Sequence, residues 1–148
     1  MENNFQLTYP LDYQSRKIIK DLVAFPVPVQ LKNTEPATAA NYGVFFTAPK
    51  DKSYAVASVS EIHGTKGTDG SAVTLQIERL QGTEALDSGD EILATAFDLK
   101  GADNTVQYGI LKQTDVTVVQ NGNRLALKDA GTPTSVANLQ VTVWLIEL

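Results

Sequence analysis

The sequence predicts an all-β protein built as an antiparallel sandwich of two sheets with about eight short strands. From residue 43 onward, apolar and polar residues alternate in short runs, as they do in half-buried strands. Turn residues interrupt these runs roughly every 8 to 13 residues. No helical pattern separates the runs, which disfavours parallel βαβ units. We favour a jelly roll over an immunoglobulin-like sandwich, although periodicity does not give the strand order.

Proline and glycine divide the chain into two regions. Five of the six prolines fall within the first 49 residues, whereas all ten glycines lie at or after Gly43. Pro26 and Pro28 fix their own φ angles and push their neighbours toward extended backbone. We therefore expect an extended N-terminal arm over residues 1–40 and a β-sandwich domain over residues 41–148.

A short amphipathic helix is predicted within this arm, over residues 15–24. Ser15 is placed to cap its N-terminus. The apolar residues at helical spacing are Ile18, Ile19, Leu22 and Val23. A helix of two to three turns is marginal alone, so we expect it to pack against the body of the protein or, alternatively, on a neighbour.

The predicted strands follow in order along the domain. They cover residues 42–48, 54–62, 72–80, 92–99, 105–111, 116–119, 124–128 and 139–148. In the second strand Ile62 falls out of step with Ala55, Ala57 and Val59, which predicts a bulge there.

Alternation also predicts which side chains form the core. In residues 72–80, Val73, Leu75 and Ile77 should face inward. Thr74, Gln76 and Glu78 should then face outward. For the next two strands only the grouping is predicted. Leu93, Phe97 and Leu99 share one face, with Ile92, Ala94 and Ala96 on the other, and residues 105–111 alternate through Val106, Tyr108 and Ile110.

The last strand is apolar on both faces, which sets it apart from the others. One face holds Leu139, Val141, Val143 and Leu145, and we assign it to the core. The other face holds Trp144, Ile146 and Leu148. A strand with two apolar faces must be central in its sheet or covered by another layer. Trp144, Ile146 and Leu148 are therefore predicted to form an interface between subunits.

Composition excludes several classes of function. A net charge of −5 disfavours binding to nucleic acid or to an anionic membrane, since both require clustered Lys and Arg. No run of about 18 apolar residues is present, so no spanning helix is predicted. Without cysteine there is no disulfide, thiolate zinc site or cysteine nucleophile. The first residues do not have the pattern of a secretion signal.

Motifs for chemistry are weak, and we predict no catalytic, cofactor-binding or metal-binding residues. His63 is the single histidine, two residues from Glu61, and we interpret it as a surface or loop residue. The segment 64–70 has the composition of a phosphate loop but leads into a strand, so a hairpin loop is favoured. The acidic turn around Gly89 fits no EF-hand and is interpreted as a solvated turn.

Aromatic side chains offer one alternative, a platform that binds sugars. The candidates are Tyr42, Tyr54, Tyr108 and Trp144, whereas Phe45, Phe46 and Phe97 are assigned to the core. Use in a core or interface is favoured for all of them.

Several strand sequences resemble the β-sandwich virion proteins of tailed bacteriophages. The similar segments, spread over roughly residues 43–148, are Ala48-Pro49, VTLQIE (73–78), ATAFDL (94–99), GNRLAL (122–127) and VTVWL (141–145). The resemblance implies a jelly-roll capsid decoration (cement) protein, or a related head or tail component, that commonly forms trimers. It implies no enzymatic activity.

From this resemblance we expect the protein to be made in the host cytoplasm and to lie on the capsid surface. The expected partners are other copies of the chain, in a trimer, and the major capsid protein or another virion protein. The residues of the arm expected to contact the capsid are Ile18, Ile19, Leu22, Val23, Pro26 and Pro28. The alternative function is a carbohydrate- or receptor-binding module of a tail or fibre.

Overall fold

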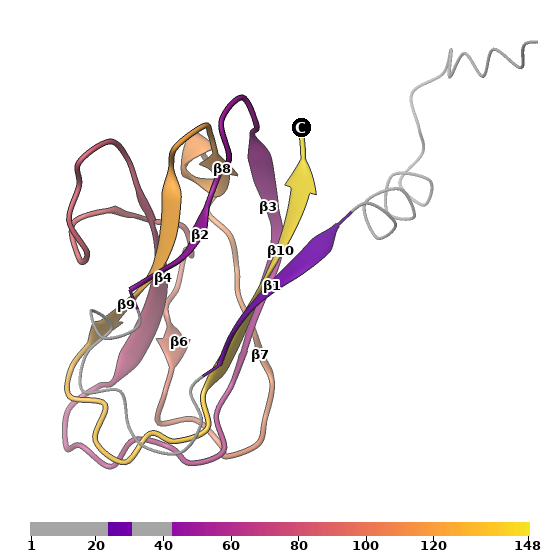
Figure 1. The fold of residues 1–148 in the computed structure, drawn as a ribbon. Coiled ribbons are helices and arrows are strands. Elements are labelled where there is room, and N and C mark those ends of the chain that lie inside the picture. Colours follow the sequence, from indigo (N-terminus) through magenta and orange to yellow (C-terminus); the bar gives the residue numbers. More distant parts are fainter. Residues whose placement is uncertain (1–23, 31–42) are drawn as a thin grey trace, which may run out of the picture.

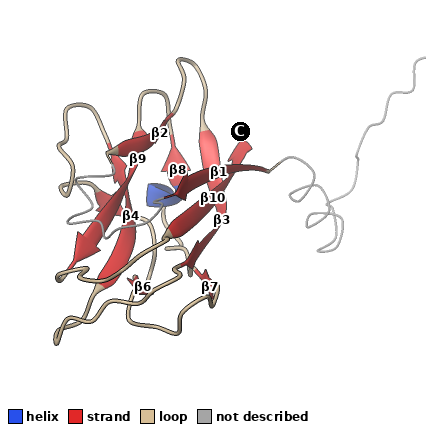
Figure 2. Cartoon of the chain, turned by 60° about the horizontal axis from the view of Figure 1, so that its bottom comes forward, coloured by secondary structure: helices blue, strands red, loops and turns tan. Residues whose placement is uncertain are grey.

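A computed structural model describes residues 24–30 and 43–148 of the chain. These residues form two antiparallel sheets, which lie face to face as a β-sandwich (Figure 1). Helix is almost absent from the described residues, as Figure 2 shows, apart from one 3₁₀ turn, η2 (Asp115–Thr117). No helix among them is long and apolar enough to cross a membrane. The predicted all-β sandwich is thus confirmed.

Most neighbouring strands in the two sheets are distant in sequence, although β4 pairs with the two strands that follow it, β5 and β6. Sheet A has the order β1-β10-β3-β7, with β8 also paired to β3, and sheet B has the order β2-β9-β4-β5, with β6 also paired to β4. The strands of sheet A are β1 (Phe25–Gln30), β3 (Tyr54–Ile62), β7 (Gln107–Tyr108), β8 (Val118–Val119) and β10 (Gln140–Glu147). Those of sheet B are β2 (Val44–Thr47), β4 (Thr74–Leu80), β5 (Asp90–Glu91), β6 (Phe97–Asp98) and β9 (Arg124–Ala130).

The core lies between the two sheets and is filled by the inward faces that alternation predicts. Val73, Leu75 and Ile77 are buried, as are Leu93, Phe97 and Leu99 from the following segment. From the last strand, Leu139, Val141, Val143 and Leu145 are all at most 2% exposed. β10 lies between β1 and β3 in sheet A. This central position is one of the two that the apolar faces of the strand predicted.

The outward face of β4 is not exposed to solvent at two of its three predicted residues. Gln76 and Glu78 are buried, because the chain that follows β4 folds back over them. The Glu78 carboxylate accepts hydrogen bonds from the backbone N–H groups of Asp87 and Gly89, both at 2.8 Å. The Gln76 side chain pairs with the backbone N–H and C=O of Leu93. These bonds satisfy the buried polar groups.

Two local predictions need correction in β3 and in the loop after it. The pairing of β3 with β10 shifts beside Ala57, opposite Trp144 and Leu145, rather than at Ile62. Because of this shift, Tyr54 and Val56 before it share the inward face with Val59 and Glu61 after it, whereas Ala55 and Ala57, which the alternation had grouped with Val59, are only half-buried. The segment 64–70 is not a hairpin loop, because it carries the chain from β3 in sheet A to β4 in sheet B.

Part of the expected arm belongs to sheet A. β1 pairs with β10 along its whole length, with Pro26 opposite Trp144 and Pro28 opposite Thr142. β1 is an edge strand, where proline is tolerated because one side of its backbone needs no ladder partner. The predicted helix over residues 15–24 lies outside the described residues, apart from Ala24 at its end. This holds for its apolar residues Ile18, Ile19, Leu22 and Val23 as well.

Candidate functional site: the outer face of sheet A

The outer face of sheet A is formed by side chains that point away from the core on β1, β10, β3 and β7. Directly paired residues of antiparallel strands point to the same face. One row across the sheet therefore consists of Pro28, Thr142, Ser60 and Tyr108. The next row contains Pro26, Trp144 and Ser58. The sheet thus presents one continuous face to the outside.

This face carries no charge. The five strands of sheet A contain only two charged residues, Glu61 and Glu147. Glu61 is on the inward face and buried, and Glu147 lies at the end of β10, where it forms an ion pair with Lys52. The hydrogen bond from Lys52 to Glu147 raises the pKa of the lysine amine. At the opposite end of β10, Gln30 donates a hydrogen bond to Gln140. Polar groups therefore mark both ends of an uncharged surface.

The predicted interface residues lie on this face or at its end. Trp144 is 38% exposed and Leu148 is 70% exposed, while Ile146 is half-buried. We call these three residues of the chain end the Trp144 ridge. No partner chain is present in the structure, so their role in an interface stays a prediction.

A second set of exposed apolar residues lies on β7 and directly beside it. Val106, Tyr108 and Ile110 are 45%, 80% and 66% exposed, and we call them the β7 ridge. Their alternation was recognised, but the residues between them face the core. A signal was available in the sequence, since Gly109 within an alternating run indicates a close approach of the backbone to another group.

The other aromatic candidates divide between core and surface. Tyr54 is buried and makes edge-to-face contacts with Phe25 and Phe46. Phe97 is buried, and Phe45 and Phe46 pack against the core as predicted. Tyr42 lies outside the described residues. Among the described candidates for a sugar platform, Tyr108 and Trp144 are therefore the exposed ones, and both lie on the outer face of sheet A.

His63 is fully buried, which contradicts its interpretation as a surface residue. Its Nδ1 lies 2.8 Å from Oε1 of Glu61, and its Nε2 lies 3.3 Å from the carbonyl oxygen of Gly101. A carbonyl only accepts, so Nε2–H donates to Gly101, and one proton is shared between Nδ1 and Glu61. With both ring nitrogens engaged and no exposure, this histidine offers no accessible base.

Glu61 connects the buried pair to β7. Its Oε2 accepts a hydrogen bond of 2.7 Å from the Gln107 side chain, which also pairs with the backbone of Asp98. Burial raises the pKa of the Glu61 carboxyl, and its hydrogen bonds to His63 and Gln107 oppose that shift. The cluster ties the edge of sheet A to β6 of sheet B, so its role is in holding the fold together.

The carboxylates near Gly89 do not converge on a shared site. Asp90 accepts a hydrogen bond from Arg79, and Glu91 lies 3.5 Å from Lys128. The described residues contain no group of three or more His, Cys, Asp or Glu side chains arranged to hold a metal ion. Arg79 also donates to the backbone carbonyls of Asp115 and Val118, at 2.7 and 3.0 Å, and so joins the two sheets at one end of the core.

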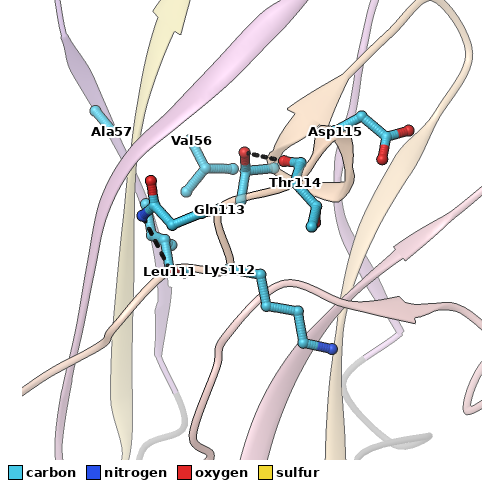
Figure 3. Close-up of a pocket in the computed structure, with 8 residues that line it drawn as sticks. Val56, Ala57, Leu111, Lys112, Gln113, Thr114 and Asp115 are labelled. Carbon is cyan, nitrogen blue, oxygen red and sulfur yellow. Dashed lines mark hydrogen bonds between the residues drawn. The ribbon is translucent and has the colours of Figure 1, made fainter.

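An open hollow of about 460 Å³ lies where β3 is irregular (Figure 3). Val56 and Ala57 of β3 form one wall, and the segment 111–117 forms the other. Its charged residues are engaged elsewhere, because Lys112 lies 3.9 Å from Glu91 and Asp115 lies 4.0 Å from Arg79. The hollow gathers no set of groups suited to catalysis.

Comparison of the chain with protein-family models, with curated proteins and with solved structures found no match. The uncharged outer face of sheet A is consequently the feature from which a function is best inferred.

Proposed function

We propose that this protein is a non-enzymatic structural protein that assembles through the outer face of sheet A. The observation that carries the proposal is the exposure of Trp144, Tyr108 and Ile110 on a face without charge. Aromatic residues are enriched and charged residues depleted in the cores of protein interfaces. A monomeric protein rarely exposes a large continuous apolar patch.

We further propose a jelly-roll topology for the sandwich. Jelly rolls consist of eight strands in two sheets. The orders β1-β10-β3-β7 and β2-β9-β4-β5 support this topology if the short pairs β5 with β6 and β7 with β8 each count as one interrupted strand. The chain then moves to the other sheet after every strand except β4, and the first strand lies beside the last.

The assembly that we propose is the head of a tailed bacteriophage, where the protein acts as a capsid decoration protein. This proposal rests on the resemblance of the strand sequences. Its partners are other copies of the chain, in a trimer, and the major capsid protein. A protein that binds only the assembled shell shifts the equilibrium toward it, and joined subunits bind more tightly through their effective concentration. Such a role requires no active site.

Light scattering and pelleting with capsids test this proposal. The purified protein is expected to have the mass of three chains at micromolar concentration, and to pellet with assembled heads but not with unassembled capsid protein. A variant lacking residues 1–23 keeps β1 and is expected to bind heads more weakly. A single-chain mass would refute the assembly, and absence from heads would refute the decoration role.

A second candidate function is recognition of a glycan by the same face. It is favoured by the exposure of Tyr108 and Trp144 on one uncharged surface, because aromatic rings can stack on sugars. A glycan array separates the two functions. Binding that is lost in both Tyr108→Ala and Trp144→Ala variants would support the glycan function, and an array without hits would remove it.

A further inference from the structure

The β7 ridge and the Trp144 ridge are separate features of one face. Tyr108 pairs with Ser60 on β3, and Ser60 pairs with Thr142 on β10, two residues before Trp144. Neighbouring strands lie about 4.8 Å apart, so the backbones of β7 and β10 are separated by roughly 10 Å. Ser58 and Ser60 of β3 lie between them. Two ridges of large side chains therefore flank a trough of small ones.

The β7 ridge is held in place from the inner side of the sheet. Gln107 is bound to Glu61, and the backbone N–H of Gly109 donates to the carbonyl of Val59 at 2.8 Å. A Cβ atom at Gly109 would lie only 2.8 Å from Cδ2 of Leu93, so a larger residue here would have to displace this buried side chain. The three exposed apolar side chains consequently project from a fixed backbone, which lowers the entropic cost of binding a partner.

The charge distribution indicates what covers the two ridges. An uncharged apolar face needs a partner surface that is also uncharged, because an unpaired charge buried against it would be costly. Across the strands of the described structure, charges are concentrated in sheet B, whereas the outer face of sheet A has none. With a net charge of −5, two copies repel each other least when they meet through this face. A second copy of the chain therefore matches the surface.

We propose that the β7 ridge of one copy packs against the Trp144 ridge of a second copy. This inference rests on the proposed assembly and assigns both halves of its contact. Because the two halves are different surfaces, after a single contact one copy retains a free Trp144 ridge and the other retains a free β7 ridge. Repetition of such a contact produces a closed ring when the rotation closes. The trough of Ser58 and Ser60 gives the ridges room to approach.

The decisive experiment mixes two variants that each lack one half. Trp144→Arg removes the Trp144 ridge and leaves the β7 ridge intact, while Tyr108→Arg does the reverse. Both side chains are exposed, so the circular dichroism spectrum of each variant should match that of the wild type. Alone, each variant is expected to lose self-association on the order of a hundredfold. Mixed in equal amounts, they should form a complex of two chains, because one intact junction remains between them.

Ala130→Arg is the matched control, because it adds the same charge at an exposed position in sheet B and should assemble like the wild type. Ile110→Arg provides a second variant of the β7 ridge, with the same expected result as Tyr108→Arg. The inference is overturned if the mixture contains only single chains, since the two ridges then do not meet. It is also overturned if both β7 ridge variants assemble normally, which would indicate contact of Trp144 with its own counterpart or with the trough. A wild type that is itself a single chain would instead refute the proposed assembly.

Discussion

The outer faces of the two sheets differ in how the protein uses charge. The strands of sheet B contain eight charged residues, namely Glu78, Arg79, Asp90, Glu91, Asp98, Arg124, Lys128 and Asp129, whereas those of sheet A contain Glu61 and Glu147. In sheet B, Glu78 and Arg79 fix loops and Glu91 lies near two lysines. Sheet A keeps charge away from its outer face. Loops of the chain itself thus use the charges of sheet B, and the uncharged face of sheet A supports the proposal that a second copy covers it.

The largest effect is expected where a charge of sheet B stabilises the single chain. Arg79→Met retains an apolar stem but leaves the carbonyls of Asp115 and Val118 without their donor. Since the guanidinium is almost entirely buried, we expect the free energy of unfolding to fall by about 3 kcal/mol in urea denaturation.

Arg124→Met is the control for this prediction. Arg124 also donates to two backbone carbonyls, those of Gly82 and Glu84, but at the exposed surface. Its loss should cost less than about 1 kcal/mol. If both variants lose the same free energy of unfolding, burial of the guanidinium does not determine how much it contributes to stability.

A charge placed on the outer face of sheet A should have the next largest effect. Ser60→Glu puts a carboxylate in the trough between the two ridges, where assembly would bury it. We expect self-association to weaken by about 2 kcal/mol, or roughly thirtyfold, as measured by sedimentation. Lys128→Glu introduces the same group in sheet B and should leave the mass unchanged. If Lys128→Glu lowers the mass and Ser60→Glu does not, assembly uses sheet B rather than the outer face of sheet A.

The one buried charge of sheet A predicts a pH dependence. Burial raises the pKa of Glu61 above its ordinary value of 4.5, and the charge of nearby Asp98 acts in the same direction. The folded protein then binds a proton more tightly than the unfolded chain. This contribution to stability is fully present below the unfolded pKa and is lost as the pH rises through the raised folded pKa.

Glu61→Gln should remove this dependence while retaining side-chain contacts to His63 and Gln107. The stability of the wild type relative to this variant is therefore expected to decrease as the pH rises above about 4.5. Urea denaturation at a series of pH values measures it. A difference that stays constant, or that grows with pH, would contradict the raised pKa.

The smallest effect is expected for the exposed ion pairs of sheet B. Lys128→Met removes the contact with Glu91, in which both side chains are partly exposed. The free energy of unfolding should change by less than about 0.5 kcal/mol. Thermal denaturation in low and high salt checks this. A large loss of stability in low salt that disappears in high salt would show that this exposed ion pair stabilises the fold more than expected.

The sequence could predict the parts of the fold that depend on local alternation. The core face of β4 and the inward residues of β10 follow from a period of two. The burial of Glu78 could not be predicted, because it depends on a loop that returns from residues 87 and 89. The burial of His63 likewise depends on Gly101, which is 38 residues away in the sequence.

The candidate site could also be predicted only in part, because alternation is a local signal and the direction of a side chain depends on distant contacts. Alternation showed that Trp144, Ile146 and Leu148 share a face. Because the opposite face of β10 fills the core, this face points outward. Alternation also grouped Val106, Tyr108 and Ile110 but could not give their direction, because that depends on how Gln107 and Gly109 fit against the core. A period of two defines the two faces of a strand without saying which one is buried.

Quenching of tryptophan emission tests the central claim most directly, since Trp144 is the single tryptophan of the chain. Acrylamide quenching of the wild type at micromolar concentration is compared with that of the Ser60→Glu variant. Assembly through the outer face of sheet A should protect Trp144 in the wild type, whereas in the variant the ring should be quenched as a partly exposed side chain. Equal and efficient quenching in both proteins would contradict the claim that this face is covered by a second copy.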